Sequence, residues 1–458
     1  FILKNHLKLN VYKIDLEKEI QFPNKKESWL SLVKEAKNSR LPTRKRTRDP
    51  KFVLRSCGIT MDYSRQNVNS KILKKLIALA KDSDLTNRIL AISKGDPDIE
   101  QRRLGAGHML LRSLGNYPEF LNKRVKNEID RELEKFLLFS DKLRNYKILG
   151  WKNNPIKNVV VLGLGGSILG PKLVTEALRT KENTNKIKLF FISNPDCCQL
   201  DSTLNTLQAS ETFFLIQSKS FKTPEILILK NYVSKWMKKN GCSEINLKNH
   251  FSIVTANLRK SKLEGFLKDF TFKIWDWVGG RFSVWSSVGL PLAISIGPKK
   301  FREFLNGARI MDQHFLNECF ESNLPVISGL LSIWNRNFLN LSSYAVVTYS
   351  SKLDLLVNYI QQLDMESLGK NIHSDGQHCE IDTGQIVWGG AGIEGQHAYF
   401  QLLHQGKHVV PVDFYGLKKT DDLYENENFN SSFIISSLEA QADSLFWGDK
   451  NKNFEGRQ

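Results

Sequence analysis

The sequence predicts an α/β fold with two doubly wound domains, parallel sheets and extra helices at the N-terminus. Short apolar runs alternate with amphipathic segments from about residue 158 onward, and buried strands that alternate with helices form parallel sheets. The chain of 458 residues is long enough for more than one domain. Its hydrophobic content of 41% and charged content of 25% are ordinary for a globular protein.

We expect three regions along the chain. Residues 1–117 are predicted to be mostly helical, because 71–83 and 101–114 carry apolar residues at helical spacing, the second in spite of two glycines. A smaller α/β domain is expected over 118–290. A larger one is expected over 291–458, with the N-terminal helices packed on it and its C-terminal part incomplete.

Each strand of the smaller domain is a short apolar run that ends in polar or glycine residues. The strands are predicted at 158–164, 186–193, 212–219 and 251–255. Helices follow at 171–180 and at 223–240, where Thr223 is the expected N-cap and Pro224 the first helical residue. In the larger domain, strands are predicted at 344–350 and 409–414. Ligands of such folds bind at the carboxyl ends of the strands.

The net charge of +18 raises nucleic acid as a partner. The basic residues are spread along the chain, and the one dense cluster, 42–51, is interpreted as a solvated loop rather than an RNA-binding segment. We therefore expect no nucleic acid partner, and the apolar runs are too short and interrupted to favour a membrane partner. The six cysteines form no CxxC pair, which favours reduced thiols in the cytoplasm and no metal site.

The stretch VVVLGLGGSILGP joins the first strand to a helix through a glycine-rich loop. Gly163 and Gly165 fit the dinucleotide fingerprint, but Ile168 stands where its third glycine belongs. Backbone N–H groups and the Ser167 hydroxyl at a helix N-terminus suit a single phosphate. Two alternatives are a tight turn without a ligand, and a nicotinamide dehydrogenase with Asp196 as the ribose-binding acid.

The stretch QSKSFKTPE follows the third strand and precedes a helix. Ser218, Ser220 and Thr223 supply hydroxyl groups, and Lys219 and Lys222 supply positive charge, so together they suit a phosphate dianion. The alternative is a loop whose hydroxyls only cap the helix. Since the carboxyl ends of parallel strands meet at one edge, we expect this loop and the first to share one phosphate.

Three further stretches carry residues suited to acid–base chemistry. Gly280 and Arg281 in DWVGGRFSVW place a guanidinium where it can stabilise an oxyanion. Asp364 and Glu366 in QQLDMESLGK lie at the expected end of a helix, where a carboxylate can act as a general base. His397 follows a glycine-rich turn, opens a helical pattern and can move protons. The alternatives are an arginine paired with a carboxylate, a charged helix end and a structural histidine.

Taken together and in this order, five segments resemble the phosphoglucose isomerase family: GLGGSILGP, SKSFKTPE, VGGRFSVWSSVGLP, QLDMESLGK and GQHAYFQLLHQG. The segment DYSRQNVN, 62–69, is similar to the N-terminal region of the family. The resemblance covers the chain from about residue 45.

The resemblance implies two sugar-isomerase (SIS-type) domains and a homodimer with active sites at the subunit interface. It implies interconversion of glucose 6-phosphate and fructose 6-phosphate through a cis-enediol(ate), without metal, nucleotide or other cofactor. It assigns Glu366 as the base, His397 as the ring-opening residue supplied by the partner subunit, and Arg281 as the residue near the reacting carbons. The substrate-binding residues that it implies are Gly166, Ser167, Ser218, Lys219, Ser220, Thr223, Gly280 and Gln362.

One departure from the family pattern supports an alternative function. The family continues past a segment like NFEGRQ, 453–458, into a helix whose lysine assists ring opening, and this sequence has no counterpart. The alternative is therefore a non-catalytic or impaired relative that binds a sugar phosphate.

Overall fold

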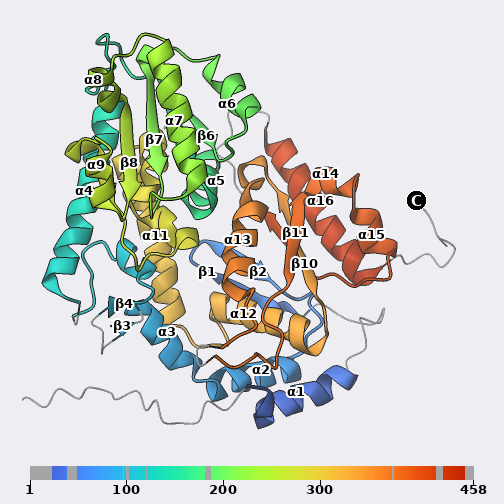
Figure 1. Ribbon diagram of the computed structural model, residues 1–458. Coiled ribbons are helices and arrows are strands. Elements are labelled where there is room, and N and C mark those ends of the chain that lie inside the picture. Colours follow the sequence, from blue (N-terminus) through green and yellow to red (C-terminus); the bar gives the residue numbers. More distant parts are fainter. Residues whose placement is uncertain are drawn as a thin grey trace, which may run out of the picture.

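Two parallel sheets with helices around them form the protein (Figure 1). The computed structural model describes residues 23–38, 49–95, 97–98, 103–119, 121–180, 187–373, 376–418 and 427–448. Most of the basic cluster, 42–48, and the final segment 453–458 lie outside these ranges. In the part of the chain that is described, no helix is both long enough and apolar enough to cross a membrane.

The first sheet has five parallel strands in the order β6-β5-β7-β8-β9. They are β5 (Asn158–Gly163), β6 (Lys188–Ile192), β7 (Thr212–Gln217), β8 (Phe251–Thr255) and β9 (Thr271–Lys273). The chain runs from β5 outward to β6 and then back across β5 to β7, so the strand order reverses between β5 and β7. The four predicted strands are confirmed. The fifth, β9, has only three residues, too few for a periodic pattern.

Helices cover both faces of this sheet, because successive side chains of a strand point to opposite faces. Val159 and Val161 of β5 belong to one core, and Val160 and Leu162 belong to the other. The first core is closed by α4 (Lys123–Arg144), α10 (Leu290–Ile296) and α11 (Pro298–Asn317), and the second by α6 (Cys197–Leu204) and α7 (Pro224–Lys239). The short helices α5 (Leu169–Ala177), α8 (Glu244–Leu247) and α9 (Leu258–Leu263) complete this half.

The predicted domain boundary near residue 290 stays a prediction. Leu292 of α10 and Phe301 of α11 pack in the core of the first sheet, with Val159 and Val161. These two helices therefore contribute to the first core although they follow residue 290.

The second sheet has three parallel strands in the order β11-β10-β12. They are β10 (Ser343–Tyr349), β11 (Ile386–Ala391) and β12 (Val412–Gly416), with α13 (Leu356–Leu368) between the first two in sequence. The sequence predicts β10 and β12 but not β11, whose end resembles a glycine-rich turn. The first of these glycines, Gly389, is required: it has φ +135°, and a Cβ there would lie 2.0 Å from the Val346 carbonyl oxygen of β10. The helices α14 (Gly392–Gln396), α15 (Phe400–Gln405) and α16 (Glu427–Trp447) follow β11 and β12.

The N-terminal region packs on α12 (Leu324–Ile333), as Figure 1 shows for α1 (Glu27–Asn38) and α2 (Ser70–Asp82). The predicted helix at 71–83 is confirmed, and Asn69 caps it by accepting from the Ile72 N–H. α3 (Leu85–Ser93) continues the helical stretch.

The prediction of a helix at 101–114 is wrong. That stretch forms the short strand β4 (Arg103–Leu104), which pairs with β3 (Pro97–Asp98), and then a 3-10 turn, His108–Arg112. Gly107 is required for packing, because a Cβ there would lie 2.4 Å from the Trp277 ring.

A two-stranded hairpin is a further departure from the mostly helical prediction for this region. It consists of β1 (Val53–Ser56) and β2 (Ile59–Asp62), joined by Cys57 and Gly58, both with positive φ. Such a turn favours glycine or asparagine at both positions. Because Cys57 occupies the first of them, the sequence lacks the usual pattern of a hairpin turn.

Trp334 is the largest fully buried side chain of the core that the N-terminal region shares with α12. Its Nε1 donates to the Asn67 carbonyl at 2.8 Å, and its ring stacks on Phe338.

We predict that Trp334→Ala lowers the free energy of unfolding by about 3–5 kcal/mol, and that Trp334→Phe lowers it less because phenylalanine keeps an aromatic ring. Urea denaturation measures both. Leu263→Ala, at a side chain that is 78% exposed, is the control and should change stability little. A small effect of Trp334→Ala would contradict the assigned packing.

Candidate active site

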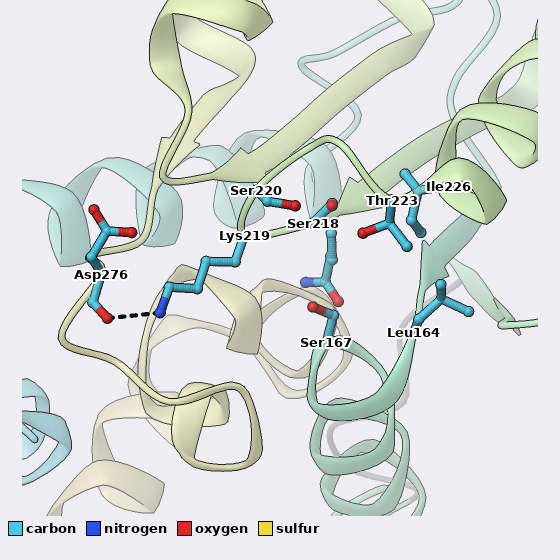
Figure 2. Close-up of a pocket in the computed structure, with 9 residues that line it drawn as sticks. Leu164, Ser167, Ser218, Lys219, Ser220, Thr223, Ile226 and Asp276 are labelled. Carbon is cyan, nitrogen blue, oxygen red and sulfur yellow. Dashed lines mark hydrogen bonds between the residues drawn. The ribbon is translucent and has the colours of Figure 1, made fainter.

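A pocket of about 310 Å³ lies between the loops that follow β5 and β7 (Figure 2). This is where the strand order reverses, the position at which doubly wound folds bind ligands. Its lining residues come from three segments: Leu164, Ser167, Gln217, Ser218, Lys219, Ser220, Thr223, Ile226 and Asp276. The two loops predicted to share one phosphate therefore do line one pocket.

The serine hydroxyls of the second loop are oriented to donate. The Phe221 N–H donates to Ser218 Oγ at 3.1 Å, and the Lys222 N–H donates to Ser220 Oγ at 3.2 Å. Each hydroxyl oxygen thus accepts from the backbone, and its hydrogen has no acceptor among the described residues. A phosphate offers only acceptor oxygens when it is a dianion, so this polarity suits it.

Thr223 is the N-cap of α7, as predicted, and Pro224 is the first helical residue. Its side chain makes no capping hydrogen bond, so the alternative of a loop that only caps the helix does not hold for this hydroxyl. Figure 2 shows it directed into the pocket, opposite Ser167. The N-terminus of α7 adds partial positive charge to this side of the pocket.

Lys219 forms one wall of the pocket. Its Nζ donates to the carbonyl oxygens of Asp276 at 2.7 Å and Val278 at 3.1 Å, which holds the ammonium group in place (Figure 2). Lys222 is exposed and does not line the pocket, so its contribution to binding stays a prediction.

Asp196 has a structural role that removes support for the dehydrogenase alternative. Its carboxylate accepts from the Cys198 N–H at 2.8 Å and caps α6.

The glycine-rich loop after β5 meets the arginine segment backbone to backbone at Gly166. A Cβ on Gly166 would lie 2.1 Å from the Gly280 carbonyl carbon and 2.6 Å from the Arg281 nitrogen. In addition, the Ser283 hydroxyl donates to the Gly166 carbonyl at 3.2 Å. Only glycine fits at 166, and this contact fixes the distance from the pocket to Arg281.

Arg281 and Glu366 form an ion pair, with Nη1 and Oε1 3.1 Å apart. The Arg281 Nε donates to the Ser367 hydroxyl at 2.6 Å, and its carbonyl accepts from the Tyr359 hydroxyl at 3.0 Å. The alternative of an arginine paired with a carboxylate therefore coincides with the functional prediction, because the carboxylate is the predicted base. The Arg281 side chain is 20% exposed and that of Glu366 is 53% exposed, so both are open to a ligand.

The last turn of α13 presents Glu366, as the predicted helix end requires. Lys370 Nζ donates to the carbonyl oxygens of Glu366 and Ser367, both at 2.6 Å, and stabilises this helix terminus. Asp364, two residues earlier, accepts from the Tyr344 hydroxyl at 2.9 Å. Burial raises the pKa of the Asp364 carboxyl, and the hydrogen bond from Tyr344 opposes that rise. Of the two acidic residues, only Glu366 reaches Arg281.

Gln362 lies one turn before Glu366 and faces the phosphate loop. A Cβ on Gly165, which has φ +50°, would lie 3.0 Å from its Nε2. Its Oε1 is buried without a partner among the described residues. Gln362 therefore lies beside the glycine-rich loop and one turn from Glu366, and its contact with a substrate stays a prediction.

His397 does not open a helix, so that part of the prediction is wrong. It is the C-cap of α14, its N–H donates to the Glu394 carbonyl at 3.0 Å, and its side chain is exposed. Among the described residues, no hydrogen bond or ion pair joins it to Glu366 or Arg281. The glycines before it are explained by packing, since a Cβ on Gly392 would lie 2.2 Å from the Tyr349 ring.

His108 is a neighbour of the site that the sequence did not indicate. Its ring stacks on Phe282 with centroids 4.4 Å apart, directly beside Arg281. Burial, followed by the positive charges of Arg112 and Arg281, lowers the pKa of His108 to about 4. The ring is therefore neutral near pH 7. In the sequence, His108 is a histidine within an apolar segment. That pattern does not distinguish a residue near the site from a histidine in the core.

The fold and the site define a parallel α/β protein with a hydroxyl-rich pocket at the switch point of its sheet, next to a segment that carries an arginine–carboxylate pair. The sequence pattern of the family described as phosphoglucose isomerase matches residues 62–457. The chain belongs to the phosphoglucose isomerase family.

Individual relatives agree with this assignment. The chain is 39% identical to glucose-6-phosphate isomerase of Hahella chejuensis over 398 residues, which cover 87% of this chain and 71% of the relative. It is 36% identical to glucose-6-phosphate isomerase of Pseudoalteromonas translucida over 428 residues, which cover 92% of this chain and 77% of the relative. The crystal structure of a glucose-6-phosphate isomerase from Chlamydia trachomatis superposes with a TM-score of 0.84 at 28% identity, covering 94% of this chain and 84% of the other.

The Thr223 hydroxyl provides a direct test of the phosphate pocket. We predict that Thr223→Val, which keeps the shape and removes the donor, weakens binding of inorganic phosphate about 10- to 100-fold, since a hydrogen bond to a charged group contributes about 1.5–3 kcal/mol. Isothermal titration calorimetry measures the affinity. Thr203→Val is the control, because that hydroxyl does not line the pocket and donates to the Gln199 carbonyl of α6 at the surface. Equal phosphate affinity in the two variants would argue against the pocket.

Proposed function

We propose that the chain interconverts glucose 6-phosphate and fructose 6-phosphate with Glu366 as the base and Arg281 as the stabiliser of the intermediate. The reaction itself follows from the family and from relatives at about 40% identity. One observation carries the assignment of residues: the Arg281–Glu366 pair is tied to the phosphate pocket through the Gly166–Gly280 contact. A sugar anchored by its 6-phosphate would then extend toward that pair.

Glu366 suits a proton transfer between two adjacent carbons. In the open-chain aldose, a base removes the proton from C2, a cis-enediol(ate) forms, and the same base returns the proton to C1. One carboxylate can serve both carbons if it lies over the C1–C2 bond. Glu366 lies on the last turn of α13, where the helix and the Lys370 hydrogen bond to its carbonyl hold its backbone in one position. The carboxylate can therefore stay over the same bond during both proton transfers.

Arg281 would face the negative charge that develops on the oxygens of the enediolate. Its contribution is greatest in the transition state, where that charge appears. The Ser367 and Tyr359 contacts hold the guanidinium and its backbone, so the charge is oriented before the substrate arrives. When the sugar enters, the Glu366 carboxylate exchanges its ion pair for contact with the substrate.

Ring opening and the homodimer belong to the same proposal. A proton must move onto the ring oxygen before isomerisation, and an imidazole suits that step near neutral pH. His397 is exposed and unconnected to the ion pair within one chain. We therefore assign His397 of the partner subunit to the site, with two equivalent sites in the homodimer. We also assign the reaction to the cytoplasm, where glycolysis and gluconeogenesis use both hexose phosphates.

Replacement of the base tests the mechanism. We predict that Glu366→Gln lowers kcat for conversion of fructose 6-phosphate by about 10²–10⁴-fold, because general base catalysis contributes about that factor. A coupled assay measures turnover, and calorimetry with inorganic phosphate should give an unchanged affinity. Glu303→Gln, at an exposed carboxylate paired with Lys300, is the control. Normal turnover in Glu366→Gln would refute the assigned base, and sugar-phosphate binding without turnover in the unsubstituted protein would favour a non-catalytic relative.

Mixed dimers test the shared site. Chains with Glu366→Gln and chains with His397→Ala should each be inactive alone. If each site combines Glu366 of one chain with the histidine of the other, a mixed dimer has one intact site. Random re-association of equal amounts should then restore about a quarter of the sites. Coupled assays before and after subunit exchange measure this, and no recovery despite verified exchange would show that each site uses its own chain.

A further inference from the structure

Gln217 is a buried residue of the phosphate pocket to which the mechanism above gives no role. It is the last residue of β7, pairs in register with Gly163 of β5 and Val254 of β8, and is fully buried. It also lines the pocket, directly before Ser218. A polar side chain in the centre of a parallel sheet needs partners at both ends of its amide.

One end of the Gln217 amide holds the segment that follows Arg281. Its Nε2 donates to the Val288 carbonyl at 2.8 Å. Because a carbonyl oxygen only accepts, this bond settles which end of the amide is nitrogen. Val288 lies in the 3-10 turn Ser287–Gly289, which adjoins the turn Gly280–Trp285 that carries Arg281.

Ser286 joins the two turns by hydrogen bonds. The bond from Gln217 to Val288 is therefore connected to the turn that carries Arg281. The Ser286 N–H donates to the Ser283 carbonyl at 2.9 Å, and the Ser286 side chain accepts from the Val288 N–H at 3.2 Å. Ser283 in turn donates to the Gly166 carbonyl of the phosphate loop. Gln217 therefore lies on a short, continuous route between the pocket and the arginine.

The other end of the amide has no partner. Gln217 Oε1 is buried and accepts no hydrogen bond from any of the described residues. A buried acceptor without a donor is unfavourable, so a state that brings a donor to it is stabilised. A phosphate dianion has no hydrogen to donate. The donor is then a hydroxyl of the pocket or a water that the bound phosphate orders beside it.

We propose that Gln217 is a positioning residue that couples the phosphate pocket to Arg281. In the phosphate-bound state its Oε1 accepts a hydrogen bond within the pocket, while its Nε2 keeps hold of Val288. Phosphate binding thus fixes the segment on which Arg281 is placed, and part of the binding energy of the remote phosphate serves the reaction at C1 and C2. This inference rests on the proposed function, since it concerns how the isomerisation uses its phosphate group.

The substitution Gln217→Met tests the coupling, because methionine has nearly the same size and no amide. We expect the affinity for inorganic phosphate to fall about three- to tenfold and kcat for fructose 6-phosphate to fall about tenfold. In an Arg281→Lys background, the same substitution should change kcat less than twofold, since there the orientation of the guanidinium no longer matters. Gln217→Leu repeats the test should methionine impair folding, and thermal unfolding verifies the fold of each variant.

The control is Ser252→Ala on β8. This serine is also fully buried with an unpartnered hydroxyl among the described residues, but it does not line the pocket. It should leave phosphate affinity and kcat unchanged. Unaltered phosphate affinity in Gln217→Met, or an equal loss of kcat in both Arg281 backgrounds, would overturn the coupling. An inactive unsubstituted enzyme would instead overturn the proposed function, and the phosphate titrations distinguish the two failures.

Discussion

The contact between Gly166 and Gly280 is the constraint on which the site depends. Two backbones meet there without side chains, since a Cβ at 166 would lie 2.1 Å from the Gly280 carbonyl carbon. One glycine belongs to the loop after β5 and the other to the turn that carries Arg281. The hydroxyl-lined pocket and the guanidinium are therefore placed relative to one another by this contact, and α13 adds Glu366 through its ion pair with the same arginine.

The pocket and the ion pair obtain their orientation from ordinary local structure. Backbone N–H groups occupy the acceptor sites of Ser218 and Ser220, which leaves the hydroxyl hydrogens for a ligand. Lys219 is held by two carbonyls, and Glu366 by the end of a helix. Each of these groups is thus oriented before a ligand binds, which limits the entropy lost on binding.

The sequence predicts those parts of the molecule whose signal is local. Strands β5, β7 and β8 are buried on both faces and are continuous apolar runs, and Thr223 with Pro224 marks the start of α7. Two of the features that the sequence failed to predict depend on contacts distant in sequence. β11 contains Gly389 because the backbone of β10 passes close to it, and the segment before His108 contains Gly107 because Trp277 packs on it. The pairing of Arg281 with Glu366, 85 residues apart, leaves no local pattern at all.

The exposure of the Arg281–Glu366 pair has a consequence for product release. Because the Glu366 carboxylate is 53% exposed, water screens its pairing with the 20% exposed Arg281 side chain, and an incoming sugar can displace it. The same pair can form again as soon as the sugar leaves, and neither charge is then left without a counterion. Under the proposed mechanism, departure of the product is then opposed mainly by the contacts of its phosphate group. The ion pair of the empty site forms in the same way after either hexose phosphate leaves. It therefore gives no preference to one direction of a reaction that runs both ways in the cell.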